Sequence, residues 1–312
     1  MNTAVLFLIF NRPGLTKQVF ERIREVEPKV LFIGADGPRD DKDVLLCKQT
    51  RDIVLQHIDW PCEVKTLLRD ENLGCKIAVS SAITWFFENV EQGIILEDDC
   101  LPDISFFSFC EELLKKYETD ESIWHIGGNN YLLSEVGDGS YYLSKIPLSW
   151  GWATWKRAWK HFDAAIQNYN PHDKNIFFSD EEIDNYWNDI FNSIKVKGTK
   201  NIWDFQWANA LFLNKKFSLL PQYNLVKNIG FGAKALHTKD PFDICAHLKA
   251  YTISPIKDPG ILEYHPEADI NLHRILGWYS KYYTKQLSGK AAGKVLVNRL
   301  SQRLIKRSFF KI

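Results

Sequence analysis

The chain has 312 residues, of which 45% are hydrophobic and 25% charged, as in a soluble globular protein with one large domain or two. It contains no run of about 18 apolar residues, so no membrane-spanning helix is expected. The net charge is zero but unevenly distributed, because ten Lys or Arg residues and no Asp or Glu follow residue 270. This asymmetry predicts a separate basic tail.

The six cysteines form no CxxC pair and no Cys/His spacing typical of a zinc site. They indicate buried free thiols in a reducing compartment, so a cytoplasmic protein is expected. The apolar segment 3–10 lacks the basic start and the cleavage site of a signal peptide, and a turn at 11–14 follows it. We therefore interpret this segment as a first strand.

Short apolar runs alternate with helical patterns through the first half of the chain. The predicted strands are 4–10, 29–33, 63–68, 93–97 and 124–127, and the predicted helices between them are 16–26, 43–57, 76–89 and 102–116. Strand–helix alternation repeated three times predicts an α/β fold with a mostly parallel central sheet flanked by helices.

The second half of the chain is less regular. Helices are predicted at 181–194 and 203–213 and a strand at 217–221, whereas the tryptophan-rich segment 149–159 is assigned no element. The resulting domain organisation is a main domain at 1–245 and a linker with a basic amphipathic helical tail at 246–312. The main domain divides into two halves, at 1–125 and 126–245.

The most informative stretch is an apolar strand that ends in three carboxylates, Glu97, Asp98 and Asp99. Adjacent carboxylates at the end of a buried strand repel one another, and a divalent cation relieves that repulsion. Oxygen ligands suit Mg²⁺ or Mn²⁺, and ligands of open α/β sheets bind at the carboxyl ends of strands. The alternative is a solvated acidic turn.

Polar residues also follow the neighbouring strands: Asn11 and Arg12 follow the first, Asp36 the second and Arg69 the third. Parallel strands bring these side chains to one edge, where they predict a crevice for phosphate, a base or ribose, and a metal. Neither GxxxxGK[ST] nor GxGxxG occurs, so a nucleotide would be held by individual side chains and a metal. The alternatives are a plain turn at 36–38 and a surface cation at Arg12.

Four segments together resemble a known family: Asn-Arg at 11–12, Asp-Gly-Pro at 36–38, Glu-Asn-Leu-Gly at 71–74, and Glu-Asp-Asp at 97–99 with Pro-Asp-Ile-Ser-Phe-Phe behind it. They resemble GT-A glycosyltransferases, most of all the family of the animal enzyme that adds the first N-acetylglucosamine to the N-glycan core. The resemblance covers roughly residues 3–240. It implies a GT-A fold and inverting transfer of a sugar from a nucleotide diphosphate, such as UDP-N-acetylglucosamine, to a glycan or lipid-linked acceptor. It also implies that residues 1–125 are the nucleotide-binding half of the domain and residues 126–245 the acceptor half.

The resemblance also implies roles for individual residues of the first half. The last acid of the family's Glu-Asp-Asp block coordinates Mn²⁺, which holds the donor diphosphate, and this position corresponds to Asp99. Glu97 and Asp98 would support the nucleotide, while Arg12 and Asp36 would contact it.

The second half matches the family more loosely. Leu-Ser-Trp-Gly-Trp at 148–152 resembles an acceptor-side segment, which makes Trp150 and Trp152 candidates for sugar contacts. Trp-Asp-Phe-Gln-Trp at 203–207 resembles a segment whose Asp, here Asp204, is the catalytic base. Gly-Phe-Gly at 230–232, followed by His237, resembles a loop that closes over the donor, with His237 touching phosphate. The alternatives are core packing for the tryptophans, a helix N-cap for Asp204 and a structural role for His237.

Two other functions remain open. A nucleotidyltransferase would use the same crevice to make a nucleotide sugar, and a non-catalytic protein would bind carbohydrate or membrane without turnover. The basic tail suits an anionic membrane surface, which would place the protein on the inner face of the membrane, or else it packs on the domain with a solvated basic face. Nucleic acid is not expected as a partner, because no recognition motif accompanies the charge.

Overall fold

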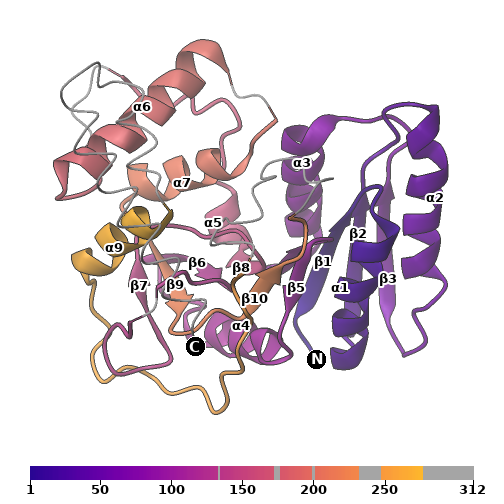
Figure 1. Cartoon of the computed structure of the whole chain (residues 1–312), viewed down its shortest axis with the longest axis horizontal. Coiled ribbons are helices and arrows are strands. Elements are labelled where there is room, and N and C mark those ends of the chain that lie inside the picture. Colours follow the sequence, from indigo (N-terminus) through magenta and orange to yellow (C-terminus); the bar gives the residue numbers. More distant parts are fainter. Residues whose placement is uncertain (133, 172–175, 199–200, 232–246, 277–312) are drawn as a thin grey trace.

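The computed structural model describes residues 1–132, 134–171, 176–198, 201–231 and 247–276. His237 and the tail from residue 277 onward therefore lie outside the described residues. In the described part, an eight-stranded sheet has the order β3-β2-β1-β4-β8-β6-β9-β7, and β5 and β10 form a separate antiparallel pair (Figure 1).

The strands have the following bounds: β1 (Ala4–Ile9), β2 (Val30–Ala35), β3 (Glu63–Leu68), β4 (Gln92–Glu97), β5 (Cys100–Pro102), β6 (Ile123–Gly127), β7 (Tyr141–Ser144), β8 (Trp152–Trp155), β9 (Phe217–Pro221) and β10 (Val226–Asn228). The helices are α1 (Pro13–Val26), α2 (Asp41–Leu55), α3 (Gly74–Asn89), α4 (Ser105–Lys116), α5 (Lys156–Trp159), α6 (Glu181–Lys197), α7 (Asp204–Leu213) and α9 (Pro266–Leu276).

The first four strands form the parallel half of the sheet. β1 lies between β2 and β4 and is buried along its whole length, because helices cover both faces. Its side chains alternate between two hydrophobic clusters: Leu6 and Leu8 face α3, whereas Val5, Phe7 and Ile9 face α1 and α4. A strand buried on both faces is a continuous apolar run in sequence, which is why this part of the fold was predictable.

The predicted α/β class is confirmed: the sheet is mostly parallel and helices flank it. The predicted helix at 102–116 is three residues shorter, since residues 100–102 form β5 and α4 begins at Ser105. No described helix is both long and apolar enough to cross a membrane.

The tryptophan-rich segment contains a strand that the sequence analysis did not assign. β8 runs antiparallel between β4 and β6 and joins the two halves of the sheet. Trp152 begins this strand and is 1% exposed, with its ring stacked on those of His125 and Trp203. Trp152 is therefore a core residue, as in the packing alternative, and not a residue of the pocket.

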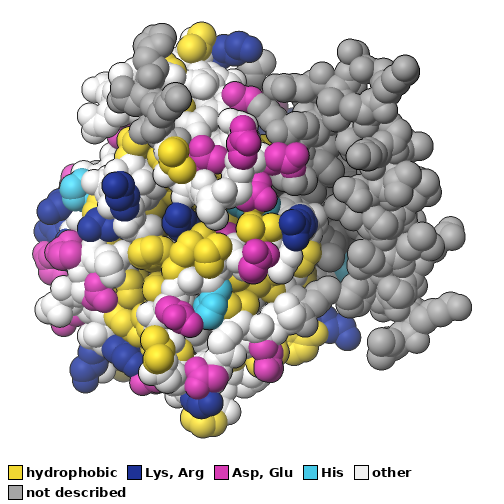
Figure 2. Space-filling model, turned by 90° about the vertical axis from the view of Figure 1, so that its left-hand side faces the viewer, with side chains coloured by type: hydrophobic (Ala, Val, Ile, Leu, Met, Phe, Trp, Pro, Cys, Tyr) yellow, Lys and Arg dark blue, Asp and Glu magenta, His cyan; other side chains and the backbone are white. Residues whose placement is uncertain are grey.

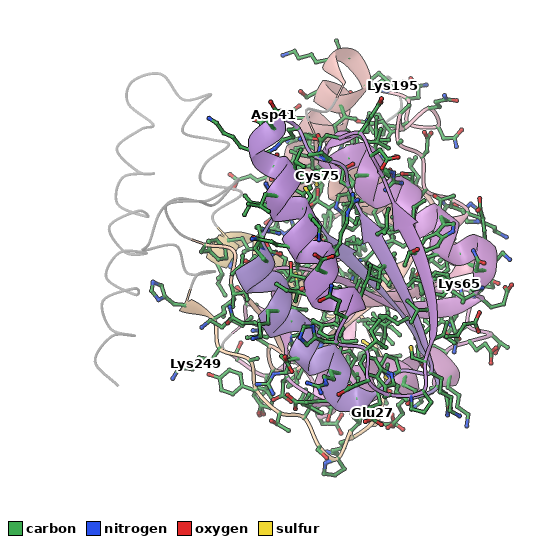
Figure 3. The ribbon with its side chains drawn as sticks, turned by 90° about the vertical axis from the view of Figure 1, so that its right-hand side faces the viewer. Glu27, Asp41, Lys65, Cys75, Lys195 and Lys249 are labelled. Carbon is green, nitrogen blue, oxygen red and sulfur yellow. The ribbon has the colours of Figure 1, made fainter. Side chains whose placement is uncertain are left out.

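The carboxyl ends of the parallel strands lie at the same edge as the amino ends of α2 and α3. In Figure 3, Asp41 and Cys75 mark those helix ends in the upper part of the molecule, and Glu27, which follows α1, lies at the opposite end. The side chain of Asp40 caps α2 by accepting hydrogen bonds from the backbone amides of Lys42 and Asp43.

Gly93 provides a test of how closely β4 packs against α3 and β1. A Cβ at this position would lie 2.3 Å from Cζ of Phe86 and 2.9 Å from the carbonyl oxygen of Ala4. Gly93→Ala should therefore lower the free energy of unfolding by about 1–3 kcal/mol, measured by urea denaturation. Gly14→Ala in α1 is the matched control, because a Cβ there meets nothing within 4 Å and should leave stability unchanged or slightly raised. Equal urea midpoints for Gly93→Ala and the unsubstituted chain would contradict the packing described here.

Candidate functional site

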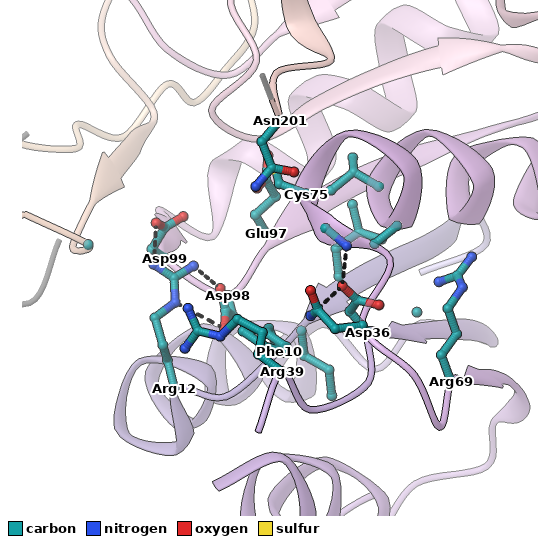
Figure 4. Close-up of a pocket in the computed structure, with 18 of the residues that line it drawn as sticks. Phe10, Arg12, Asp36, Arg39, Arg69, Cys75, Glu97, Asp98, Asp99 and Asn201 are labelled. Atoms are coloured by element: carbon teal, nitrogen blue, oxygen red, sulfur yellow. Dashed lines mark hydrogen bonds and ion pairs between the residues drawn. The ribbon is translucent and has the colours of Figure 1, made fainter. Parts of the chain in front are cut away.

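A cavity of about 300 Å³ opens at the carboxyl ends of β1, β2 and β4. Its lining comes from parts of segments far apart in the sequence: 8–10 with Arg12, several residues within 34–39 and 69–79, and 97–99, together with Trp150, Asn201, Asn228, Gly230 and Phe231. Figure 4 shows the acidic residues and Arg12 at one end of this cavity, Arg69 at the other and Asp36 between them. The cavity is therefore elongated, with different chemistry at its two ends.

At the acidic end, Arg12 bridges two carboxylates. Its Nη1 donates to Oδ2 of Asp99 at 2.8 Å, while Nε and Nη2 both donate to Asp98, whose side chain is buried. Burial raises the pKa of Asp98 despite the opposing effect of Arg12. Burial alone would lower the pKa of Arg12, but Asp98 and Asp99 outweigh it and raise that pKa above its usual value. One guanidinium thus partly neutralises this end of β4.

Glu97 is the third carboxyl group at this strand end, and the hydrogen bonds of Arg12 go to the other two. Burial, followed by the negative charge of Asp99, raises the pKa of Glu97 to about 8. Three crowded carboxylates with a single cation favour either a proton on Glu97 or an added positive charge. The donor set therefore fits a hard divalent cation, although no group of three metal-ligating side chains in the described residues is arranged to hold one.

Asp36 organises the loop after β3. Its Oδ1 accepts hydrogen bonds from the amides of Gly37 and Leu73, and its Oδ2 accepts from Nδ2 of Asn72 and the amide of Gly74, all at 2.9–3.2 Å. These four bonds occupy the acceptor positions of the carboxylate. Asp36 thus holds the start of α3 against the end of β2, and its direct contact with a base stays a prediction.

Asn11 and Arg69 have different surroundings. Nδ2 of Asn11 donates to Oδ1 of Asp43 at 2.6 Å, and Asn11 is not among the residues that line the cavity. Arg69 does line it; its Nη2 donates to Oγ of Ser81 at 2.7 Å, and burial lowers the pKa of Arg69. Arg69 therefore leaves most of its donors for a ligand at the far end of the cavity.

A short segment after β10 closes over the acidic end. The amide of Ile229 donates to the carbonyl oxygen of Asp99 at 2.8 Å, and a Cβ on Gly230 would lie only 2.4 Å from Oδ2 of Asp99. Phe231 meets the ring of Trp150 edge-on, with centroids 5.7 Å apart. Trp150 thus lies at the cavity as predicted, and a side chain at position 230 would force the side chain of Asp99 to move.

Asp204 begins α7 near this end of the cavity but is not among its lining residues. Its negative charge contributes to the raised pKa values of Glu97 and Cys75, which places it close to both. Its Oδ1 accepts a hydrogen bond from the amide of Phe205 at 3.0 Å. The N-cap position of α7 is occupied by Trp203, and Asp204 is the first residue of the helix itself, one position after the N-cap.

The lining residues that the sequence analysis did not predict include Asn201 and Cys75. Asn201 precedes α7, and its Oδ1 accepts a weak hydrogen bond from the amide of Lys76 at 3.4 Å. Cys75 lies in the first turn of α3, where burial raises the pKa of its thiol to about 12. A lone Asn and a lone Cys carry no sequence signal, because only the fold brings them beside Glu97.

Comparisons with known proteins give only remote similarity. No protein-family model matches the chain. No curated protein matches it either. Solved structures that resemble it include S. aureus TarS 1-349, at 10% identity and a TM-score of 0.42, over 89% of this chain and 70% of that one.

Two other solved structures are similar at the same level. UDP-glucose pyrophosphorylase complexed with UDP-glucose is 12% identical, with a TM-score of 0.37, over 72% of this chain and 91% of that one. The mannosyltransferase PcManGT from Pyrobaculum calidifontis, in complex with GDP-Man and Mn²⁺, is also 12% identical with a TM-score of 0.37, over 68% of this chain and 70% of that one. Similarity this remote assigns the chain neither to the pyrophosphorylases nor to the mannosyltransferases.

The raised pKa of Glu97 predicts how the stability of the folded chain depends on pH. Because the pKa of Glu97 is about 8 in the folded chain against 4.5 for an ordinary Glu, its contribution to stability is present below pH 4.5 and is lost as pH rises to 8. In a chelator, the stability of Glu97→Gln relative to the unsubstituted chain should increase between pH 4.5 and 8 and then level off. Urea denaturation across this range checks it, and a stability difference independent of pH would contradict the raised pKa.

Proposed function

We propose that the chain is a GT-A glycosyltransferase that moves a sugar from a nucleotide-diphosphate donor to a glycan or lipid-linked acceptor. The observation that carries the proposal is the carboxylate-tipped strand β4, facing Arg12 at one end of an elongated cavity. A nucleotide diphosphate suits such a cavity, because its phosphates need cations and its base needs an apolar slot with a few polar groups. The resemblance of residues 3–240 to the GT-A family supports the same function.

In this proposal the metal and the diphosphate occupy the acidic end. Asp99 holds Mn²⁺ or Mg²⁺, with Glu97 and Asp98 behind it, and the metal would neutralise the leaving diphosphate as a Lewis acid. Arg12 lies within 2.8 Å of Asp99 and would donate to a phosphate oxygen beside the metal. Arg69, at the other end of the cavity, is placed to meet the nucleoside. A UDP-sugar such as UDP-N-acetylglucosamine is the donor that the resemblance supports.

Transfer with inversion needs a base beside the acceptor hydroxyl. We assign this role to Asp204, whose charge influences Glu97 and Cys75 at the cavity. Trp150 and the neighbouring Phe231 provide an aromatic wall next to Asp99, where the face of the transferred sugar would pack. His237 as a phosphate contact, and an anionic membrane surface as the partner of the tail, remain proposals on residues outside the described ranges.

The second candidate is a nucleotidyltransferase that makes a nucleotide sugar. It would use the same metal and cavity but would bind a nucleoside triphosphate, for which a glycine-rich phosphate loop after β1 is expected. Here β1 is followed by Asn11-Arg12 and directly by α1, which begins at Pro13. The structure therefore favours a diphosphate donor over a triphosphate.

The first test is thermal stability against UDP, GDP, CMP and their common sugars, each with Mn²⁺ and with a chelator. A ligand that binds the folded chain raises the unfolding midpoint by mass action. We expect a metal-dependent shift with one class of nucleotide. Asp99→Ala should abolish that shift, because it removes the proposed metal ligand, while Asp59→Ala, an exposed carboxylate paired with Arg24, should retain it. A full metal-dependent shift in Asp99→Ala would rule out Asp99 as the ligand.

The base assignment has its own test. Asp204→Asn keeps the size of the side chain but cannot accept the acceptor's proton, so transfer should fall by about 10²-fold or more while donor binding is retained. Asp180→Asn is the matched control, because Asp180 is the N-cap of α6 and Asn is an equally good cap. Release of UDP in the presence of acceptor measures transfer, and undiminished release by Asp204→Asn would remove the assignment.

A further inference from the structure

Two tyrosines stand apart from the other aromatic residues. The chain has 20 Phe, 12 Tyr and 11 Trp, and in the described part only Tyr223 (46% exposed) and Tyr251 (54%) present their rings largely to solvent. The two rings are neighbours, with centroids 6.3 Å apart and planes at 51°. Exposed aromatic surface gathered at one place marks a binding site more often than chance exposure does.

A second cavity, of about 280 Å³, is lined by Tyr223 and shares no lining residue with the first cavity. Tyr251 does not line it, but its ring lies next to that of Tyr223. Three segments line it: the loop at 135–140, the β9–β10 connection with Tyr223, and the stretch at 252–255. The last of these belongs to the segment that runs along the bottom of the molecule in Figure 1 before α9. The cavity volume is close to the lower limit of about 300 Å³ for ordinary small-molecule sites.

Backbone hydrogen bonds hold the three segments together. The amide of Tyr251 donates to the carbonyl oxygen of Asn224 at 2.7 Å, which fixes the two tyrosines relative to each other. The amide of Ser140 donates to the carbonyl oxygen of Lys257, also at 2.7 Å, and the amide of Lys257 donates to Oγ of Ser140 at 2.9 Å. The cavity is therefore preformed, so a ligand would not have to order its walls.

The polar groups around the rings suit hydroxyl groups. The hydroxyl of Tyr223 donates to Oε1 of Glu135, which orients the ring and leaves the second oxygen of Glu135 able to accept. Oδ1 of Asp138 accepts a hydrogen bond from the amide of Gly260 at 3.0 Å, and its Oδ2 can accept one from a ligand. Carboxylates that accept from hydroxyls, beside a ring that covers C–H groups, match a sugar, and their negative charge disfavours an anionic one.

We propose that the cavity beside Tyr223 and Tyr251 binds a neutral saccharide. This site is separate from the nucleotide cavity and needs neither nucleotide nor metal, so it stands independently of the proposed transferase activity. A short stretch of chain connects the two sites, because Tyr223 is seven residues from Gly230, which lies beside Asp99. Seven residues span at most about 25 Å when extended. In a transferase, a saccharide held here would be a remote part of the acceptor.

The experiment uses the full chain in chelator, without nucleotide. A glycan array first selects neutral saccharides, and chitotriose, maltotriose, cellotriose and mannotriose are then titrated calorimetrically. We expect at least one to bind, and Tyr223→Ala and Tyr251→Ala each to weaken its binding about tenfold or more. Tyr223→Phe keeps the ring but loses the bond to Glu135, so its affinity should fall between those of Tyr223→Ala and the unsubstituted chain.

Val196→Ala is the control, since Val196 is an exposed apolar residue of α6, away from this cavity. It should bind saccharide with unchanged affinity, and equal thermal midpoints should show that all variants are folded. No binding of any of the four saccharides at millimolar concentration would overturn the proposal, as would unchanged binding by the double alanine variant. If the chain binds a saccharide but no nucleotide shifts its unfolding midpoint in the presence of metal, the saccharide site is supported and the transferase activity is rejected.

Discussion

The candidate site depends on how one arginine is shared between two carboxylates. Arg12 donates to both Asp98 and Asp99 at the end of a buried strand, where an unpaired charge would cost several kcal/mol. Asp98 is buried and receives two of the three bonds, so it anchors the guanidinium. Asp99 remains more accessible and is the carboxylate that an added cation can reach.

The same interaction links the site to the rest of the fold. Arg12 immediately precedes α1, Asp98 follows β4, and Ile229 donates to the backbone of Asp99 from the segment after β10. Parallel strands bring the first two together, and the small β5–β10 sheet brings the third. A change that moved any one of these elements would alter the charge balance at Glu97, because all three carboxylates share one cation.

The sequence predicted the parallel half of the sheet well, for a physical reason. Strands such as β1 and β4 are buried on both faces and read as continuous apolar runs, and the polar residues that follow them lie at one edge. Arg12, Asp36 and the three carboxylates were found by that rule alone. Trp150 was also placed at the cavity, but its neighbour Trp152 turned out to be core.

The remaining errors come from packing that has no local signal. Trp152 was expected in the pocket because tryptophan suits both sugar and core, and only the pairing of β8 with β4 decides which. Asp36 lines the cavity, but no local pattern indicated that four donors from the neighbouring loops would also surround its carboxylate. Asn201 and Cys75 are single residues that contribute to the cavity only after distant segments have folded against each other.

The position of β8 has a consequence for the order in which the protein folds. β1 to β4 all lie within the first 97 residues. β1 pairs with β2 across about 26 residues, but it also pairs with β4 across about 89, close to the 94 or so that separate the paired residues of β6 and β9. The order therefore follows from synthesis and not from loop size: the four parallel strands are complete before the second half of the sheet when a chain is synthesised from its amino end. β8 then pairs with the free edge of β4, and the remaining strands of the second half add to the sheet from β8 onward.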